Sequence, residues 1–495
     1  MVTTQLPQLL YRAEQVRKGE LRAAQAMQLE MYQLMRRAGE AVFSVLSQRY
    51  PTCRSVLICC GGGNNGGDGY VVARLARAAG ISVRLWQLGD AARLTGDAAR
   101  ARDDWLAVGG QITSAQSQIP DDVEVIVDAL LGTGLTGPVR EDCGQLIGLL
   151  NLAARPIIAV DVPSGLCADT GAVLGTAIQA EATVTFIGCK QGLCTGQASH
   201  YCGQRYFAGL GVEYTFASET EPSAYRLDYQ SVLHALPPRR RTAHKGDHGR
   251  VLCVGGDLGM PGAIRLAAEA CARCGAGLTA VITQSDNVLS IVTARPEIMV
   301  QGWHDKAHEI RQRRDWADVI VIGPGLGQSD WSKALLLHFE DTEKKMVVDA
   351  DGLNLLALSP DYKNNRIITP HPGEAARLLG WSVARVEADR FTAARHLQQQ
   401  FGGVVVLKGA GTLIDDGRQC WICTAGNPGM ATGGMGDVLS GIIGALAAQG
   451  MSLSEAARTG VWIHSTAADL CARDGERGML ASDLFPYLRQ LVNPR

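Results

Sequence analysis

One acid stands directly behind a run of glycines near the C-terminal end of the sequence, in Gly434-Met-Gly-Asp437, and an apolar stretch typical of a helix follows it. Glycines ahead of a helix leave backbone N–H groups unpaired, and these groups, together with the helix dipole, bind anions such as phosphate. Asp437 is either a helix cap or a base that takes the proton of an attacking hydroxyl in phosphoryl transfer. A cap needs no glycines before it, so the pattern favours phosphoryl transfer.

Three further turns in the second half follow predicted strands. They are Gly323–Gly327, Thr369–Glu374 and Lys408–Thr412. Open α/β sheets bind ligands at the carboxyl ends of their strands, where glycines let the backbone approach a nucleotide, and ordinary tight turns are the alternative. His371, between two prolines, is either a substrate contact or part of a rigid turn. The Gly-x-x-x-x-Gly-Lys-Ser/Thr motif of P-loop enzymes does not occur in the sequence.

Asparagines, acids and glycines gather in the same way after strands of the first half. One apolar strand leads into a turn that contains Asn64-Asn-Gly-Gly-Asp68, whose amides and carboxylate offer oxygen ligands and hydrogen-bond donors to ribose or phosphate. A plain turn rich in Asn and Gly is the alternative. Two other apolar strands end in Asp128 and Asp161, which are either helix caps or part of a site. Oxygens of Asn65, Asp128 and Ser164 suit a monovalent or divalent cation.

Short apolar strands alternate with amphipathic helices through two stretches of the sequence. This alternation predicts two three-layer α/β/α domains, each with a largely parallel sheet that helices cover on both faces. The polar, proline-bearing stretch 217–241 interrupts the rhythm, so we place the domains at 1–217 and 218–495. We expect a helix at 70–79, after the first glycine-rich turn, and two long helices at 437–449 and 453–473.

The first forty residues are predicted to be helical, over 9–17 and 23–41. A stripe of large apolar side chains runs along the second of these helices. Its members are Met27, Met31, Leu34 and Met35. Such a stripe is typical either of a protein core or of a contact between subunits. We expect a homo-oligomer.

Composition and charge narrow the class of protein. The chain has 495 residues, 46% of them hydrophobic, and a formal net charge of −2, so it can fill more than one core and offers no basic field to nucleic acid or an anionic membrane. A secretory signal and a transmembrane run are both absent from the sequence. We therefore expect a cytoplasmic protein whose 14 cysteines are free thiols. The pairs Cys271/Cys274 and Cys420/Cys423 either bind zinc or are small buried hydrophobes, and their predicted helical and strand settings favour the second interpretation.

The motifs of the second half resemble a known family across residues 225–495. In order, they are Lys245-Gly-Asp-His-Gly-Arg-Val-Leu, Gly255-Gly256 with Gly262-Ala263, Gly323–Gly327, Thr369–Glu374, Lys408–Thr412 and Gly434–Asp437. This series is similar to the ribokinase-like ADP/ATP-dependent NAD(P)H-hydrate dehydratases. The resemblance implies that Asp437 is the catalytic base and that Mg²⁺ accompanies the nucleotide. It places the hydrate on Ala263, Gly327, His371 and Asp437, and the nucleotide on Lys408, Gly409, Ala410, Gly411, Thr412 and Gly436. Met435 departs from the small or hydroxyl residue common in this fold, but the backbone donors remain.

The loops of the first half resemble the YjeF N-terminal domain, a Rossmann-like fold whose enzymatic members are NAD(P)H-hydrate epimerases, over residues 9–217. The resemblance implies that Asp161 is the acid/base residue at C6 of the hydrated nicotinamide, with Lys190 facing the same pocket. It also implies that K⁺ binds to Asn65, Asp128 and Ser164. The residues implied to bind the hydrate are Asn64, Asn65, Gly66, Gly67, Asp68, Gly132, Thr133, Gly134, Leu135, Thr136, Gly137, Pro138 and Asp161.

Together the two resemblances imply a bifunctional repair enzyme for NADHX and NADPHX, the hydrates of NADH and NADPH. The first half would convert the R epimer to the S epimer, and the second half would remove water from the S epimer while ADP becomes AMP and phosphate. Two alternatives stay open: an ordinary ribokinase-like kinase for a small alcohol, and a first half that binds ligands without catalysis. The residues do not decide between ADP and ATP, or between NADHX and NADPHX.

Overall fold

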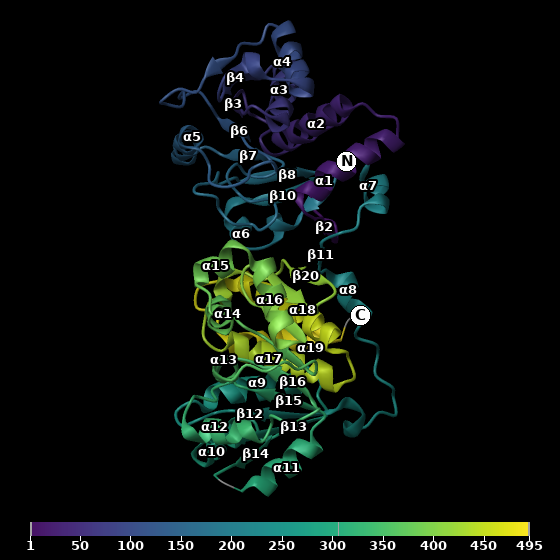
Figure 1. Cartoon of the computed structure of the whole chain (residues 1–495), viewed down its shortest axis with the longest axis vertical. Coiled ribbons are helices and arrows are strands. Elements are labelled where there is room, and N and C mark those ends of the chain that lie inside the picture. Colours follow the sequence, from purple (N-terminus) through teal and green to yellow (C-terminus); the bar gives the residue numbers. More distant parts are fainter. Residues whose placement is uncertain (1, 305, 494–495) are drawn as a thin grey trace. The chain divides into compact units, whose positions relative to one another are not determined.

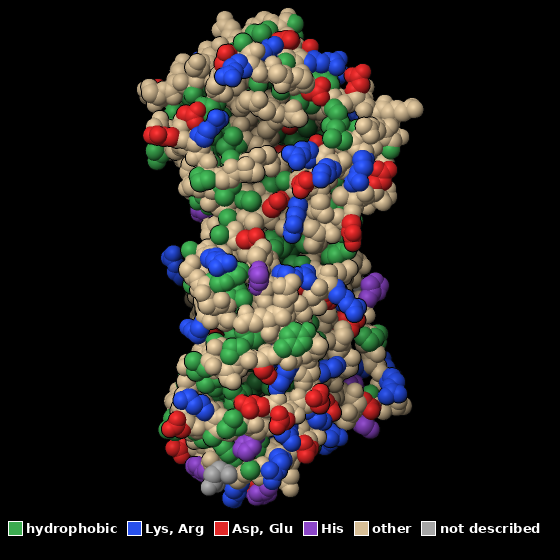
Figure 2. Space-filling view, in the orientation of Figure 1, with side chains coloured by type: hydrophobic (Ala, Val, Ile, Leu, Met, Phe, Trp, Pro, Cys, Tyr) green, Lys and Arg blue, Asp and Glu red, His purple; other side chains and the backbone are tan. Residues whose placement is uncertain are grey.

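The computed structural model describes residues 2–304 and 306–493. The chain folds into two compact units, Met1–Arg226 and Leu227–Arg495, called unit 1 and unit 2 below. Both contain a sheet flanked by helices (Figure 1), so the predicted fold class is confirmed. No helix among the described residues is long and apolar enough to cross a membrane. In Figure 2, basic and acidic side chains are interspersed over the visible face.

The sheet of unit 1 has the order β1-β10-β8-β7-β6-β3-β4-β5, parallel throughout except for the edge strand β1. The strands are β1 (Val2–Thr3), β3 (Ser55–Cys60), β4 (Ser82–Gln87), β5 (Thr113–Ser114), β6 (Val125–Ala129), β7 (Ile157–Val160), β8 (Ala182–Phe186) and β10 (Gln204–Ala208). Along the chain, β4 and β5 are added on the outer side of β3, whereas β7, β8 and β10 are added on the outer side of β6. Such a reversal between adjacent strands is where open α/β sheets bind ligands.

Alternating side chains of β3 point into two different hydrophobic cores, one on each face of the sheet of unit 1. Val56, Ile58 and Cys60 belong to the core that also contains α2 (Met31–Arg49) and α3 (Asn64–Ala78). Leu57 and Cys59 belong to the core on the other face, which contains α5 (Glu141–Leu152). Because successive strand side chains point to opposite faces, an all-apolar strand of this kind requires helices on both sides.

The first forty residues differ from the sequence prediction. Residues 9–11 form a strand, β2 (Leu9–Tyr11), that pairs with β9 (Cys189–Lys190) and β11 (Ala224–Arg226), so the helix predicted at 9–17 is wrong in its first turn. The helix proper is α1 (Ala13–Ala26), and the left-handed backbone of Gln28 (φ 54°) separates it from α2. Pairing with residues far along the chain overrides local propensity here.

Helix α3 begins at Asn64, six residues before the predicted start at Tyr70, so the first glycine-rich turn is shorter than expected. The glycines inside the helix allow close packing. A Cβ atom on Gly66 would lie 2.1 Å from the carbonyl oxygen of Gly61, and one on Gly67 would lie 2.6 Å from the Met35 side chain. The sequence prediction placed these glycines in a turn before the helix, whereas they lie inside it and let it approach its neighbours.

The sheet of unit 2 has the order β14-β13-β12-β15-β16-β17-β18-β19-β20. Strands β14 to β18 are parallel, and β18, β19 and β20 are antiparallel. The strands are β12 (Arg250–Val254), β13 (Leu278–Thr283), β14 (Met299–Gly302), β15 (Val319–Ile322), β16 (Lys345–Val348), β17 (Arg366–Ile368), β18 (Val404–Leu407), β19 (Thr412–Asp415) and β20 (Cys420–Cys423). The order in which strands are added reverses between β12 and β15. A second ligand-binding site is therefore expected at the carboxyl ends of these two strands.

The two long helices predicted near the end of the chain are present as α17 (Met435–Ala448) and α18 (Leu453–Cys471), and a shorter helix that was not predicted, α19 (Phe485–Leu491), follows them. Helix α17 packs against β15, β16 and α9 (Pro261–Arg273). The remaining helices of the parallel part connect successive strands: α10 (Val288–Ala294), α11 (Ala307–Trp316), α12 (Asp330–Leu337), α13 (Asp351–Leu358), α14 (Pro372–Leu379), α15 (Val383–Ala388) and α16 (Arg390–Phe401). Right-handed crossovers place the connections on opposite faces on either side of the reversal.

The two Cys-x-x-Cys pairs lie in a helix and a strand, as predicted. Cys271 is in α9 and Cys274 follows it, whereas Cys420 and Cys423 bound β20. All four are buried and free of disulfides. Among residues 2–304 and 306–493, no three His, Cys, Asp or Glu side chains are grouped to hold a metal ion. Burial raises the pKa of the Cys274 and Cys420 thiols, so both are packed as small hydrophobes.

Two candidate active sites

A cavity of about 1110 Å³ lies in unit 1 at the reversal of its sheet. The turn after β3 and the loop after β6 meet there, since a Cβ atom on Gly61 would lie 1.8 Å from the carbonyl oxygen of Leu130. The cavity collects most of the residues implied to bind the hydrate. These are Asn64, Asn65, Asp68, Gly132, Thr133, Gly134, Leu135, Thr136, Pro138 and Asp161. Gly66, Gly67 and Gly137 are not among its lining residues, and the first two pack behind it.

Asp161 follows β7 and forms the ionic centre of this cavity. The Nζ atom of Lys190 donates to Asp161 Oδ1 at 2.5 Å, in a pair whose side chains are 2% and 15% exposed. Thr185 Oγ1 and the backbone N–H of Phe186 also donate to Oδ1. All hydrogen bonds of this carboxylate within the described residues therefore end on one oxygen, and Oδ2 is left for a ligand.

The backbone at Asp161 is in the left-handed region, with φ 63°. A residue other than glycine is uncommon there, and the strain persists only where surrounding structure holds it. The hydrogen bonds to Oδ1 supply that support. The left-handed backbone therefore directs the Asp161 carboxylate, at the end of β7, into the cavity. Backbone strain of this kind is retained mainly at functional sites.

A buried carboxylate lies beneath the loop of the cavity. Asp128 is 0% exposed and accepts hydrogen bonds from Ser164 Oγ at 2.6 Å, Ser164 N at 2.8 Å and Leu130 N at 3.2 Å. Burial raises its pKa to about 6 despite these bonds. The carbonyl oxygen of Leu131 accepts from both Asn65 Nδ2 and Ser164 Oγ, at 3.0 and 3.2 Å. The three predicted cation ligands are thus neighbours: Asn65 and Ser164 both donate to the Leu131 carbonyl, and Ser164 also donates to Asp128.

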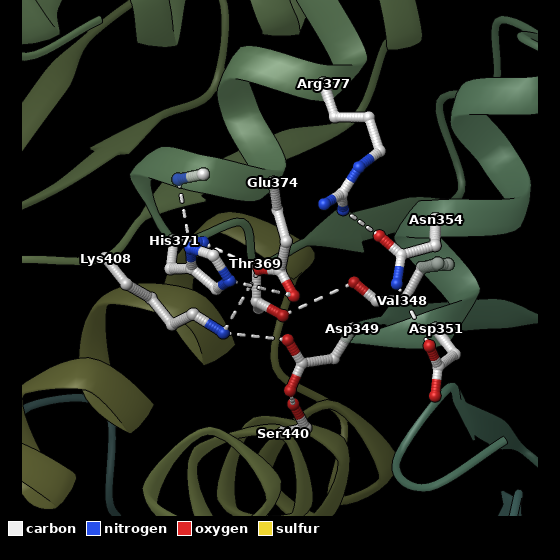
Figure 3. A network of polar contacts seen from close by, with 11 residues as sticks. Val348, Asp349, Asp351, Asn354, Thr369, His371, Glu374, Arg377, Lys408 and Ser440 are labelled. Atoms are coloured by element: carbon white, nitrogen blue, oxygen red, sulfur yellow. Dashed lines mark hydrogen bonds and ion pairs between the residues drawn. The ribbon is translucent and has the colours of Figure 1, made fainter. Parts of the chain in front are cut away.

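The corresponding edge of unit 2 carries a network of charged side chains (Figure 3). Asp349 follows β16 and is 1% exposed. Lys408, which follows β18, donates to Asp349 Oδ1 at 2.9 Å and lies 3.7 Å from Glu374, while Ser440 donates to Asp349 Oδ2 at 2.7 Å. Burial alone would raise the pKa of Asp349, but the Lys408 ammonium and the hydroxyls of Ser440 and Thr369 outweigh it and lower the pKa.

Asp437 lies in the first turn of α17, as predicted. Its carboxylate makes no hydrogen bond or ion pair with the described residues. Burial raises its pKa to about 7, the negative charge of Asp349 adds to the shift, and Lys408 opposes it. A carboxyl group that titrates near neutrality suits a general base.

The glycines around Asp437 leave space at the helix N-terminus. Gly434 has φ 90°, which a residue with a side chain rarely adopts, and a Cβ atom there would lie 2.7 Å from Leu266. A Cβ atom on Gly436 would lie 3.1 Å from Lys408 Nζ and 3.4 Å from Asp349 Oδ2. The unpaired N–H groups of α17 are therefore open to an anion on the same side as the Lys408 ammonium.

The predicted nucleotide turn Lys408–Thr412 is fixed from behind by Arg390. This guanidinium is 1% exposed, donates to the carbonyl oxygens of Leu407 and Lys408 at 3.2 and 3.1 Å, and pairs with Glu387 at 2.9 Å. Gly409 has φ 140°, and a Cβ atom there would lie 2.8 Å from the guanidinium. The buried Arg390 therefore holds the carbonyls of this turn in place and leaves its outer side to a ligand.

Besides Asp437, the three residues implied to contact the hydrate lie at the same edge of the sheet. His371 Nδ1 accepts from Gly373 N at 3.0 Å and caps α14, while its side chain stays 55% exposed. The backbone N–H of Gly327 donates to Asp351 Oδ2 at 2.9 Å. Ala263 lies in α9 against Gly325, since a Cβ atom on Gly325 would be 3.1 Å from the Cβ of Ala263.

Several acids of these sites were not singled out from the sequence. Asp349 and Asp351 flank Ala350, whose φ of 47° marks strained backbone. An acid at the end of an apolar strand was the signal that identified Asp128 and Asp161, and it applies equally to Asp349. Glu20, on α1, lines the unit 1 cavity. The signal that could have identified it is an acid one helical turn before the buried Ala23 and Ala24.

Comparisons with known proteins bear on both units. A family model described as YjeF-related protein N-terminus matches residues 31–192, and one described as NAD(P)H-hydrate dehydratase matches residues 251–490. Over 489 residues the chain is 53% identical to the bifunctional NAD(P)H-hydrate repair enzyme Nnr of Vibrio cholerae, with 99% of each covered. It is 51% identical to the Escherichia coli protein of that name over 492 residues, which are 99% of this chain and 95% of the relative.

Among solved structures, a ribokinase-like superfamily protein from Enterococcus faecalis aligns with a TM-score of 0.50 and 30% identity, covering 54% of this chain and 94% of that one. A hypothetic protein from Streptococcus mutans aligns with a TM-score of 0.51 and 29% identity, covering 54% and 99%. The expected ribokinase-like fold is therefore confirmed.

Proposed function

The chain belongs to the bifunctional NAD(P)H-hydrate repair enzymes, and on this premise we propose how its two sites divide the reaction. Unit 1 interconverts the R and S epimers of the hydrate at C6. Unit 2 removes water from the S epimer and converts ADP to AMP and phosphate, so that NADH or NADPH is restored. One chain then clears both epimers of the damaged nucleotide.

In unit 1, Asp161 moves the proton at the C6 hydroxyl. Its Oδ1 atom is held by Lys190, Thr185 and the Phe186 backbone, so Oδ2 is the atom available to the hydrate. The fixed ammonium of Lys190 keeps the carboxylate oriented. The hydrate occupies the cavity and is bound by the Asn64–Asp68 segment and the Gly132–Pro138 loop.

A potassium ion fits the residues around Asp128. This carboxylate is fully buried and has hydrogen-bond donors but no cationic side chain beside it among the described residues, so a hard cation would supply the missing positive charge. Asn65, Asp128 and Ser164 would hold the ion. Bound there, it would fix the loop above it and lend positive charge to the cavity floor.

In unit 2, Asp437 takes the proton of the C6 hydroxyl, whose oxygen attacks the terminal phosphoryl group of ADP and releases AMP. The C6–O bond of the phosphate ester then breaks, pushed by the lone pair of the ring nitrogen. Phosphate leaves, and loss of a proton from C5 restores the double bond. The backbone N–H groups around Gly436 and the Lys408 ammonium stabilise the phosphoryl charge.

The ligands of unit 2 are assigned on the same edge. Lys408, Gly409, Ala410, Gly411, Thr412 and Gly436 hold the nucleotide, and Ala263, Gly327 and His371 contact the hydrate. Carboxylates of Asp349, Asp351 and Glu374 surround Asp437. This excess of negative charge over the Lys408 ammonium suits a divalent cation, so Mg²⁺ would enter with the phosphates and offset their charge.

One observation carries the proposal for unit 2: at the N-terminus of α17, Asp437 has no hydrogen-bond or ion-pair partner among the described residues, and burial raises its pKa to about 7. The test is to incubate the protein with resolved (S)-NADHX, ADP and Mg²⁺. We expect the absorbance of NADH to appear with one AMP and one phosphate per NADH. A stable phosphorylated product with no NADH would instead support a small-alcohol kinase.

The proposal for unit 1 is tested separately with resolved (R)-NADHX in the absence of nucleotide. We expect the S epimer to appear faster than in protein-free buffer. Interconversion at the uncatalysed rate would show that unit 1 binds ligands without catalysis. Because unit 2 is silent without ADP, this result is independent of dehydration.

We also infer a cytoplasmic homo-oligomer. Of the predicted apolar stripe, Leu34 and Met35 are buried in unit 1, whereas Met27 is 42% exposed and Leu21, on α1, is 45% exposed. These two exposed side chains support a contact between copies at the end of α1. Light scattering of the wild type and a Leu21→Ser/Met27→Ser variant would test it, and identical masses would contradict it.

A further inference from the structure

One face of α1 borders the unit 1 cavity. Ala13, Val16, Arg17 and Glu20 line it and share one stripe of the helix. Glu14 also lines it, but its carboxylate is exposed and pairs with Lys18. The same face continues into the core at Ala23 and Ala24, which are 0% and 2% exposed. Glu20 therefore stands where the helix passes from cavity to core, a position at which an apolar residue would be expected.

The Glu20 carboxyl makes no hydrogen bond or ion pair with residues 2–304 and 306–493. Burial raises its pKa to about 7, the Lys190 ammonium opposes the shift, Asp161 adds to it, and Arg17 opposes it. Asp68 faces the same group, because Glu20 also contributes to raising the pKa of Asp68. Glu20 is half-buried, and holding an acid without a partner against the core costs free energy, so packing alone does not account for it.

If the C6 hydroxyl leaves and returns as water, epimerisation needs proton transfer on both faces of the hydrated ring. The hydroxyl departs from one face as water, and water returns to the other face. A single carboxyl beside one face cannot serve the second. Asp161 reaches the cavity from the end of β7, and Glu20 reaches it from α1, so the two acids come from different elements of the cavity wall.

We propose that Glu20 is the second acid/base residue of the epimerase site and works with Asp161 across the nicotinamide ring of the hydrate; the proposal rests on the epimerase function proposed for unit 1. In one direction, the lone pair of N1 expels the C6 hydroxyl, and the Glu20 carboxyl gives it a proton, so water leaves and a planar iminium ion forms. A water molecule then attacks C6 from the opposite face and loses a proton to Asp161 Oδ2.

The reaction needs only the hydrate, water and the two carboxyl groups. One C–O bond breaks and one forms, one water leaves and one enters, and nothing is oxidised or reduced. A proton has moved from Glu20 to Asp161 and returns through solvent in the cavity. The reverse direction exchanges the two roles, as an epimerase requires. The new hydroxyl oxygen comes from solvent.

The test compares Glu20→Gln, Glu20→Asp and a matched control, Glu40→Gln, whose side chain is exposed on α2 outside the cavity. Interconversion of resolved (R)- and (S)-NADHX is followed by chromatography without nucleotide, in water enriched in ¹⁸O. General acid–base catalysis contributes about 10²–10⁴-fold, so Glu20→Gln should lower kcat by at least about 10²-fold with little change in KM. Glu40→Gln should match the wild type, which should introduce ¹⁸O at C6.

The pH profile separates acid–base chemistry from a structural role. In the wild type, kcat/KM plotted against pH should show a limb near pH 7. This limb should be absent in Glu20→Gln and should lie at a different pH in Glu20→Asp. Dehydration of (S)-NADHX by unit 2 of the same variants checks that the chain is intact.

The outcomes are distinct. No epimerisation by the wild type defeats the function proposed for unit 1. A wild type that epimerises alongside a Glu20→Gln variant with unchanged kcat, or with only KM raised, overturns the role of Glu20 alone. If Glu20→Gln does not fold, Glu20→Asp decides: a lowered kcat with a displaced limb supports the proposal, and an unchanged profile overturns it.

Discussion

Replacing Asp349 by asparagine should move the acid limb of dehydration to lower pH. Asp349 is the charge that most raises the pKa of Asp437 after burial, and Lys408 is the charge that lowers it. The substitution keeps the shape of the side chain, removes the negative charge and frees the Lys408 ammonium, now 2.9 Å from Asp349, to act on Asp437. Lys408 keeps Glu374 at 3.7 Å as a second partner, so it is not left without one.

The size of the effect follows from the ionised fraction of Asp437. With a pKa of about 7, roughly one tenth of the wild-type base is ionised at pH 6. A fall of about one pKa unit, or about 1.4 kcal/mol, is modest for a neighbouring charge, since charges about 4 Å apart interact by about 4 kcal/mol at an effective dielectric constant near 20. About half of the base would then be ionised at pH 6, and kcat/KM relative to its plateau should rise about fivefold.

The assay is NADH formation from (S)-NADHX and saturating ADP between pH 5 and about 9. Ser440→Ala is the matched control, because it removes the 2.7 Å hydrogen bond to Asp349 Oδ2 without changing charge, and its limb should stay near that of the wild type. Titration of the ADP phosphates is common to all three proteins and cancels in the comparison. A limb that is unmoved in Asp349→Asn, or that moves upward, would refute the assignment of Asp437 as the titrating base.

Two further substitutions test the anion and cation sites. Gly436→Val should weaken ADP binding at least about tenfold by calorimetry, because even a Cβ atom would lie 3.1 Å from Lys408 Nζ, whereas binding within twofold of the wild type would contradict the proposed phosphate site. Asp128→Asn should abolish the rise in Tm that K⁺ gives the wild type, and an equal rise in both proteins would place the ion elsewhere. The pKa of Asp128 is raised to about 6 in the folded protein, so the folded state binds its proton more tightly; the wild type without K⁺ should therefore lose stability as pH rises from about 4 to about 6, and K⁺ should offset this loss.

The sequence was sufficient for the continuous apolar strands at the centre of each sheet and for the edge at which they end. Continuous apolar runs such as Val319–Ile322 have few alternatives to a buried parallel strand, and that strand lies where it was predicted. Asp437 was found for the same reason, since glycines before an apolar helix have one common use. Local patterns predict structure well where short-range geometry alone decides it.

Interactions between distant segments explain what the sequence did not predict. Leu9–Tyr11 became a strand because partners near residues 189 and 224 were available. Helix α3 begins at Asn64 because glycines permit contacts that a single segment does not reveal. The charges around Asp437 come from the ends of three strands, so their effect on its pKa emerges only when the sheet is assembled.

The most direct test of the account is one assay on Asp161→Asn and Asp437→Asn, each given resolved (R)- and (S)-NADHX with ADP and Mg²⁺. Asp161→Asn should restore NADH from the S epimer at the wild-type rate and should use the R epimer only as fast as it epimerises spontaneously. Asp437→Asn should restore NADH from neither, yet should still interconvert the epimers. Dehydration that survives in Asp437→Asn, or loss of both activities in Asp161→Asn with the fold intact, would contradict the division of labour between the two sites.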